Sequence, residues 1–188
     1  NFNSKDSKKI KNPKNFLGGK GANLSEMGRM GLPVPPGFTI STKVCEIFYK
    51  DKKKLNKNLI SQIKKELKLI EKDVSKKFGD LKNPLLLSVR SGARVSMPGM
   101  MDTILNLGLN DKTVKALAIK TSNGRFAKDS YRRFIQMYGN VVMGVEGYHF
   151  EELIENYKLT KGVLLDTDLD ESDWDGLIED FKRTVREK

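Results

Sequence analysis

The 188-residue sequence has few of the residues that build disulfides and metal centres, because it contains one cysteine, Cys45, and one histidine, His149. A single cysteine excludes a disulfide within the chain. Cys45 lies in an apolar helical stretch, so we expect it to be a small buried hydrophobic side chain. No apolar run approaches the length of a membrane span, and no secretory signal pattern opens the chain. These absences favour a protein of the reducing cytoplasm that makes no membrane contact.

Acidic residues are scarce in the first part of the chain. Residues 1–80 hold 19 Lys/Arg against 8 Asp/Glu, whereas residues 81–188 hold 16 of each, so the net charge of +11 belongs to the first part. Aromatic residues do not alternate with these lysines, as base-stacking surfaces would require. We therefore expect a solvated lysine-rich surface and no nucleic-acid partner.

The sequence offers no convincing metal site. Residues 166–170 resemble the opening of a calcium loop, but Glu171 stands where that loop needs glycine and Leu177 where it needs glutamate. We expect Asp170 to cap the N-terminus of a helix instead. His149 precedes an acidic helix and is expected to be a surface or capping residue.

Hydrophobic periodicity predicts an α+β protein of three segments. Residues 1–15 read as a polar lead-in, residues 16–110 as a mixed α/β lobe and residues 111–188 as an all-helical subdomain. Because the chain opens without methionine and ends inside an apparent helix, we expect it to be an excerpt of a longer protein. The elements expected in the first lobe are helix 23–30, strand 38–40, helix 42–49, helix 55–78, strand 85–89 and strand 102–109.

The apolar run Leu85–Leu87 leads into the segment Ser88–Thr103, and together they predict a buried strand that ends in a loop rich in anion-binding groups. Two guanidiniums beside small residues suit phosphate oxygens, because guanidinium is a planar fork of donors and small residues let backbone N–H groups approach. Arg90 is the first of these arginines. Arg94 could join the same phosphate site or pair with a carboxylate such as Asp102.

A second glycine-rich segment, Leu17–Met27, places Lys20 among three glycines before a helix-compatible stretch. It is not a P-loop, because Gly21 replaces the Ser or Thr that follows the lysine of that motif. It is not a dinucleotide-binding turn either, because Leu24 stands where the third glycine belongs. Alone, the segment predicts a tight turn before a helix. Together with the Arg90 loop, it favours a polyphosphate site.

Three segments together resemble the pyruvate, phosphate dikinase family, and in particular the N-terminal part of its ATP-grasp nucleotide-binding domain. They are Phe16–Thr39, Ser88–Asn110 and Arg125–Gly139, and they occur in the family's order. The motif PGMMDTILNLGLN favours this family over the related phosphoenolpyruvate synthases and other dikinases. The resemblance spans nearly the whole chain.

The resemblance implies a phosphotransferase that converts ATP, pyruvate and phosphate to AMP, phosphoenolpyruvate and diphosphate through a phosphohistidine on another domain. Lys20 and Arg90 match the family's two catalytic phosphate-binding cations. Magnesium is implied, with carboxylate ligands from the other half of the ATP-grasp domain, beyond Lys188. The expected partners are ATP or AMP, that other half, the phosphohistidine domain and the pyruvate domain, in a homodimeric parent. We expect the fragment to be inactive alone.

The loop after Arg90 supplies further candidates for the nucleotide site. The hydroxyls of Ser96 and Thr103 could donate to phosphate or simply to the loop backbone. The apolar stretch 97–101, which includes Met101, could be a flap that covers the nucleotide, or a plug packed against the helical lobe. Together with Arg94 and Asp102, these residues complete the predicted nucleotide-binding set.

Two alternatives stay open. The same nucleotide lobe could serve a phosphoenolpyruvate synthase or a drug phosphotransferase, and a non-catalytic basic module could bind polyanions through its lysines. A second anion site at Arg132 and Arg133 is disfavoured, because Asp129 lies three and four residues earlier on the same predicted helix and can pair with them. In a larger protein, that helix could instead face another domain.

Overall fold

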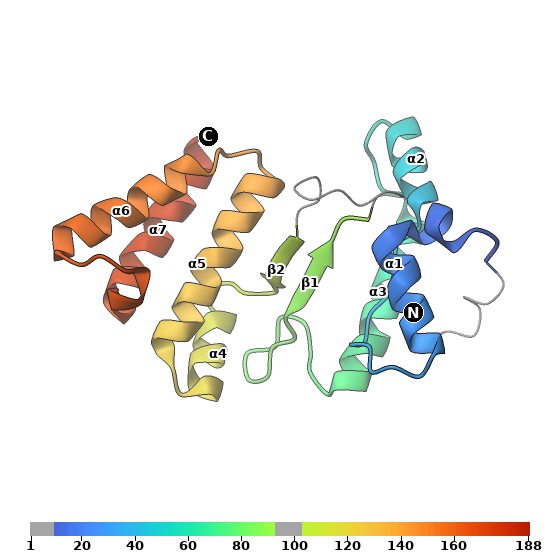
Figure 1. Cartoon of the computed structure of the whole chain (residues 1–188), viewed down its shortest axis with the longest axis horizontal. Helices are drawn as coiled ribbons and strands as arrows, with labels where there is room; N and C mark the ends of the chain where they lie inside the picture. The colour runs from blue at the N-terminus through green and yellow to red at the C-terminus, as the bar shows by residue number, and fades with distance from the viewer. Residues whose placement is uncertain (1–9, 93–102) are drawn as a thin grey trace. The chain divides into compact units, whose positions relative to one another are not determined.

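The computed structural model describes residues 10–92 and 103–188 (Figure 1). The chain separates into two compact units. Unit 1 is formed by Asn1–Ser75 and Arg90–Asp102, and unit 2 by Lys76–Val89 and Thr103–Lys188. Helices dominate the described residues, which also contain one two-stranded sheet. None of the helices that the structure describes is long and apolar enough to cross a bilayer.

Unit 1 contains the helices α1 (Pro13–Arg29), α2 (Thr42–Lys50) and α3 (Lys57–Val74). α1 contacts α2. Of the residues described in this unit, the apolar side chains of Ala22 and Ile70 are buried. Most other apolar side chains of the unit are half-buried or exposed, so its described part has little core.

The N-terminal part of unit 1 departs from the sequence prediction in two places. α1 begins at Pro13, ten residues before the predicted start at residue 23, because a proline at the first helical positions already has the helical φ. The predicted strand 38–40 is wrong: these residues are described and belong to no strand. The β-forming side chains of Phe38 and Ile40 do not make a strand where no neighbouring strand pairs with them.

Two predictions for α2 and α3 also need correction. Cys45 is exposed rather than buried, because α2 lies on the surface and buries none of its residues. α3 ends at Val74 rather than near Gly79, because Ser75 adopts a left-handed conformation that ends the helix.

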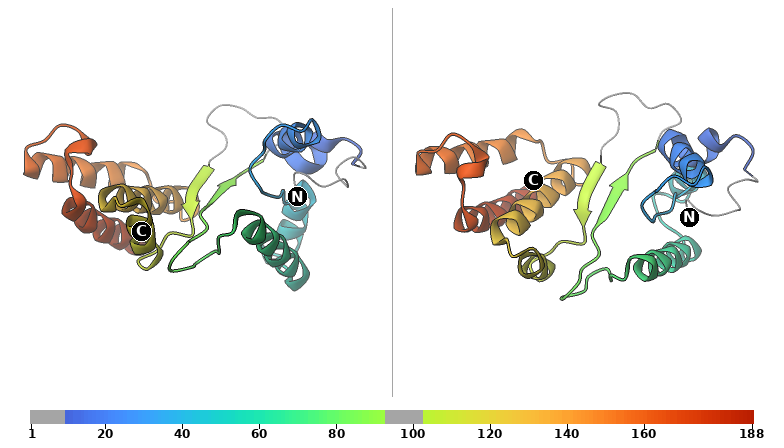
Figure 2. Two further views of the ribbon diagram at one scale, coloured as in Figure 1. Left: turned by 90° about the horizontal axis from the view of Figure 1, so that it is seen from below. Right: turned by 60° about the horizontal axis from the view of Figure 1, so that its bottom comes forward.

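Unit 2 contains the described core. Strand β1 (Leu87–Arg90), whose last residue belongs to unit 1, pairs with β2 (Thr103–Leu107). Four helices follow: α4 (Thr113–Thr121), α5 (Gly124–Val141), α6 (Tyr148–Lys161) and α7 (Glu171–Glu187). α5 contacts β2, α4 and α7, and α6 packs on α7, as further views show (Figure 2). The largest fully buried side chains are Trp174, Phe150, Phe181, Leu169, Leu177 and Thr113.

Polar side chains cap the N-termini of two unit 2 helices, α5 and α7. The Asn123 side chain accepts a hydrogen bond from the Phe126 backbone N–H at the start of α5. Asp170 caps α7 by accepting from the N–H groups of Ser172 and Asp173, which confirms its predicted role. The strands predicted at 85–89 and 102–109 are confirmed within a few residues, and the segment after residue 111 is helical as predicted. β1 is not buried as predicted, because its residues from Ser88 to Arg90 are exposed. The structure is therefore α+β, while the predicted lobe boundary near residue 110 stays a prediction.

Candidate functional site

The glycine-rich segment of α1 is a break between two helical pieces. Gly18 has φ 72° and ψ 168°, a conformation essentially restricted to glycine, and the helix resumes immediately after it. Lys20 is half-buried and lies in the first turn of the second piece, not in a turn that precedes the helix as predicted. Backbone N–H groups in the first turn of a helix lack intrahelical partners and favour anions.

The backbone of this break touches the segment that follows Arg90. A Cβ built on Gly18 would lie 2.9 Å from the carbonyl oxygen of Gly92, and one built on Gly92 would lie 3.9 Å from the Gly18 Cα. Lys20 follows Gly18 by two residues, and Arg90 precedes Gly92 by two. Two segments that are about 70 residues apart in sequence are thus in contact within unit 1.

Contacts on the other side of α1 hold this helix in place. A Cβ on Gly21 would lie 2.8 Å from the Thr39 hydroxyl oxygen, so α1 and the 38–40 segment approach closely there. The Thr42 hydroxyl donates to the carbonyl oxygen of Asn15 at 2.7 Å. The start of α2 is therefore tied to the first piece of α1.

Lys20 and Arg90 differ in exposure, but both lack a carboxylate partner among the described residues. The Arg90 side chain, at the end of β1, is exposed, whereas Lys20 is half-buried. Within residues 10–92 and 103–188, neither forms an ion pair with a carboxylate. Two cations without a counter-ion in the described part of the chain suit an anionic ligand.

The remaining predicted site residues fall mostly outside the described part of the chain. Arg94, Ser96, Met101 and Asp102 lie in the segment 93–102, which the structure does not describe, so their roles stay predictions. Thr103 is described: it is the first residue of β2 and is half-buried. Its predicted contact with phosphate also stays a prediction.

The second pair of arginines has the intrahelical partner expected from the sequence. Asp129 accepts from both Arg132 and Arg133 on α5. Arg132 is 5% exposed, hydrogen bonds to Gln136 and lies over the Trp174 ring at 4.8 Å. This arginine lies between α5 and α7, with its two Nη groups hydrogen-bonded to Gln136 and Asp129 and its buried Nε without a hydrogen-bond partner among the described residues.

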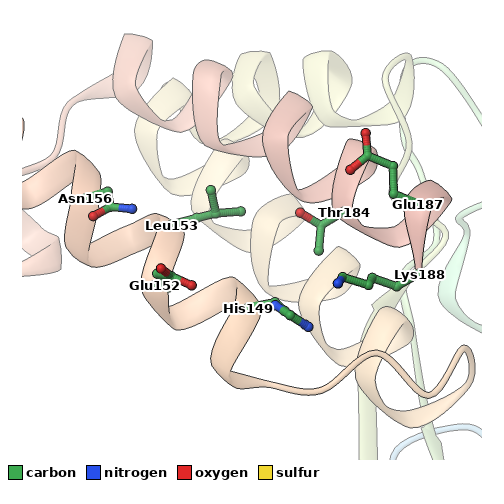
Figure 3. Close-up of a pocket in the computed structure, with 7 residues that line it drawn as sticks. All are labelled: His149, Glu152, Leu153, Asn156, Thr184, Glu187 and Lys188. Carbon is green, nitrogen blue, oxygen red and sulfur yellow. The ribbon is translucent and has the colours of Figure 1, made fainter.

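His149 borders a polar hollow of about 280 Å³ between α6 and the end of α7 (Figure 3). Its ring stacks near that of Tyr148 at 4.0 Å between centroids. No group of three or more metal-ligating side chains occurs among the described residues, there or elsewhere. The seven lining residues are His149, Glu152, Leu153, Asn156, Thr184, Glu187 and Lys188.

Comparison with known proteins finds the same relationship as the sequence motifs. Residues 14–70 match the family described as pyruvate phosphate dikinase, AMP/ATP-binding domain. The chain is 54% identical over 93% of its length to a pyruvate, phosphate dikinase of Clostridium symbiosum. The predicted resemblance is confirmed.

Other relatives show the same pattern. The chain is 55% identical over 94% of its length to a chloroplastic pyruvate, phosphate dikinase of Mesembryanthemum crystallinum. It is 52% identical over 93% of its length to a pyruvate, phosphate dikinase of Entamoeba histolytica. It spans about a fifth of the length of these curated relatives, covering 18% to 20% of each. The 14–70 match contains Lys20, the whole of α2 and most of α1 and α3. The chain therefore corresponds to one portion of much longer relatives.

Proposed function

We propose that this chain is part of the ATP-grasp nucleotide-binding domain of a pyruvate, phosphate dikinase. The parent enzyme would convert ATP, pyruvate and phosphate to AMP, phosphoenolpyruvate and diphosphate, through a histidine on another domain. The observation that carries the proposal is the contact of Gly18 with Gly92, which brings the Lys20 and Arg90 segments together in a chain similar to these enzymes.

The two cations would bind the triphosphate in different ways. The Arg90 guanidinium would bind phosphate oxygens through two parallel hydrogen bonds, because its donors form a rigid fork. The Lys20 ammonium would act as a point charge, beside the N-terminal turn of the helix that resumes after Gly18. Both would neutralise the negative charge that the transferring group carries. Arg94, Ser96, Met101, Asp102 and Thr103 would complete the site from the loop and β2.

Magnesium would supply further charge neutralisation in the complete enzyme. The described residues contain no cluster of carboxylates able to hold it. Its ligands would come from the other half of the nucleotide-binding domain, which would follow Lys188. That half, the phosphohistidine domain and the pyruvate domain would be the partners of this chain in a cytoplasmic homodimer. We expect no phosphoenolpyruvate from the purified chain alone.

A nucleotide titration tests the proposal against a diffuse polyanion-binding surface. ATP is titrated into the wild type, Arg90→Ala and Lys64→Ala. Lys64 is exposed on α3, so its loss removes one charge from the same unit without touching the site. We expect weak binding by the wild type, a loss of about tenfold in Arg90→Ala, as for a charge-assisted bidentate contact, and little change in Lys64→Ala.

The opposite outcome is equally clear. Equal small losses in both variants, with affinity that falls steeply as salt rises, would show that scattered lysines bind the nucleotide. The nucleotide-site proposal would then be wrong.

A further inference from the structure

Gly18 contacts backbone rather than side-chain atoms. A Cβ at this position would lie 2.9 Å from the Gly92 carbonyl oxygen, 3.1 Å from its carbonyl carbon and 3.2 Å from its Cα. A flexible side chain could rotate away from such a contact, but backbone can yield only if the whole segment shifts. Any side chain at residue 18 would therefore separate α1 from the segment after β1.

The two glycines of this contact are not equivalent. A Cβ on Gly92 would meet only the Leu17 carbonyl oxygen at 3.7 Å and the Gly18 Cα at 3.9 Å, which are ordinary contact distances. Gly92 has no positive φ, whereas Gly18 does. The requirement for glycine therefore falls on residue 18.

A second close approach, between α1 and Thr39, occurs at Gly21, the residue that follows Lys20 in the sequence. A Cβ on Gly21 would lie 2.8 Å from the Thr39 hydroxyl oxygen and 2.9 Å from its methyl carbon. Gly18 and Gly21 are both buried, and Lys20 lies between them in the chain. The backbone that carries Lys20 is thus held at two points, against Gly92 and against Thr39.

We infer that Gly18 is a positioning residue for the nucleotide site. Its contact with Gly92 sets how closely the backbone segments that carry Lys20 and Arg90 approach each other, and the phosphate tail of a nucleoside triphosphate would bridge the two cations. The inference rests on the proposed function. It adds that the spacing of the two cations depends on the missing side chain of Gly18, and that this spacing selects ATP over AMP.

The selectivity follows from where the two cations act. ATP carries β- and γ-phosphates that can reach both side chains, whereas AMP carries a single phosphate. A small increase in the separation of the cations removes one of two simultaneous contacts with ATP but leaves a single contact with AMP. Damage to the fold of unit 1 would instead weaken the binding of both nucleotides.

The chain offers matched variants for this test. Gly18→Ala introduces both backbone strain and the clash with Gly92. Gly31→Ala introduces comparable strain alone, because Gly31, just after α1, has φ 76° and no described atom lies within 4 Å of its added Cβ. Gly92→Ala adds a Cβ on the opposite side of the contact without strain at residue 18.

The experiment uses the whole ¹⁵N-labelled chain, with ATP and AMP titrated separately and followed by amide chemical shifts. The wild type should show a nuclear Overhauser effect between Gly18 and Gly92. Gly18→Ala should lose about tenfold in ATP affinity with little change for AMP, as expected when one of two phosphate contacts is misplaced. Gly31→Ala should keep the wild-type ratio of the two affinities, and Gly92→Ala should bind ATP more tightly than Gly18→Ala.

Each contrary outcome is informative. Wild-type selectivity in Gly18→Ala, while Arg90→Ala loses ATP, would overturn the positioning role and leave the proposed function intact. Unchanged ATP binding in both Lys20→Ala and Arg90→Ala would overturn the proposed function itself. Absence of the Gly18–Gly92 Overhauser effect in the wild type would overturn the contact.

A second variant keeps the inference testable if Gly18→Ala does not fold. Gly92→Val extends branched methyl groups from a Cβ that already lies 3.7 Å from the Leu17 carbonyl oxygen, so it separates the same backbones without strain at residue 18. It should also lose ATP affinity and keep AMP affinity. Equal retention of both nucleotides would contradict the positioning role.

Discussion

The two consecutive arginines of α5, Arg132 and Arg133, occupy different environments although they share one carboxylate, that of Asp129. Arg132 is 5% exposed and lies on the Trp174 ring, whereas the Arg133 side chain is 59% exposed. A buried guanidinium needs its counter-ion, because an unpaired buried charge is far more costly than an exposed one. The ion pairs of these two adjacent arginines are therefore expected to contribute unequally to the stability of unit 2.

The substitution Asp129→Ala should destabilise unit 2 strongly, because it leaves the Arg132 guanidinium buried and unpaired. We expect a loss of about 3–5 kcal/mol in the free energy of unfolding. Arg133→Ala is the matched control and should cost less than about 1 kcal/mol, since exposed pairs contribute little. Urea denaturation followed by Trp174 fluorescence measures both. Similar small losses would show that the buried pair contributes no more than the exposed one.

Tyr131 should make unit 2 sensitive to alkali. Burial raises the pKa of its phenol to about 12, and the hydroxyl donates to Asp111 at 3.2 Å. Because the folded-state pKa is above the unfolded value of about 10, the stabilisation is complete below pH ~10 and is lost as the pH rises through 12. The carboxylates of Asp111 and Glu179 raise the pKa of Lys182. This ammonium group therefore also loses its proton, and its ion pairs, as the pH rises.

Alkaline unfolding tests this assignment. Tyr131→Phe should remove the tyrosine with the highest pKa from an ultraviolet phenolate titration and should shift alkaline unfolding to higher pH. Tyr148→Phe is the control, because the Tyr148 side chain is 58% exposed. An unchanged alkaline midpoint in Tyr131→Phe would assign the sensitivity to other groups, such as Lys182.

At the scale of elements, α5 is the centre of unit 2, and its packing depends on a glycine. A Cβ on Gly139 would lie 2.8 Å from a methyl carbon of Val185 and 2.9 Å from the Phe150 ring. α5, α6 and α7 therefore approach one another more closely at this point than an alanine would allow.

Gly139→Ala should destabilise unit 2 even though alanine is the better helix former. Overpacking costs about 1–3 kcal/mol, which exceeds the gain of about 1 kcal/mol in helix propensity. Gly147→Ala, at the start of α6, is the control, because its Cβ would meet only the Asn140 amide nitrogen at 3.8 Å. Thermal unfolding compares the two variants. A stabilised Gly139→Ala would show that the three helices can move apart at little cost.

The helices and strands of unit 2 could be predicted from the sequence because each carries a local signal. Apolar residues recur at helical spacing in α5 and α7, and the caps Asn123 and Asp170 mark where these helices begin. The break at Gly18 and the exposure of Cys45 could not be predicted. The first depends on a contact with Gly92, far along the chain, and the second on which face of α2 other elements cover.

For the candidate site, the sequence allowed Lys20 and Arg90 to be proposed, because both stand in glycine-rich segments that resemble a known family. Their binding of phosphate stays a prediction. That Gly18 and Gly92 would touch has no local signal. Likewise, the β-forming side chains of residues 38–40 do not predict whether a partner strand lies beside them.

At the scale of the whole molecule, the two units differ in how much of their apolar surface is buried. The cluster of 13 buried apolar residues lies in unit 2, whereas the buried apolar residues described in unit 1 are Ala22 and Ile70. Unit 1 also carries most of the excess positive charge, since its residues 1–75 include nearly all of the lysine-rich part. Little core and strong self-repulsion both reduce local stability.

The rates of amide hydrogen exchange should therefore differ between the two units. We expect amides of α2 and α3 to exchange much faster than those of α5 and α7, because the latter open only with the core of unit 2. ATP at saturating concentration should slow exchange in α1 more than in α5. Equal protection of α3 and α7 without ligand would contradict the unequal cores.

A crystal structure of this chain with bound ATP tests most directly whether two cations from distant segments bind one triphosphate. The account predicts that the Lys20 ammonium and the Arg90 guanidinium both lie within about 3 Å of β- or γ-phosphate oxygens, with Gly18 still against Gly92. A nucleotide whose phosphates contact only one of these side chains, or neither, would contradict it.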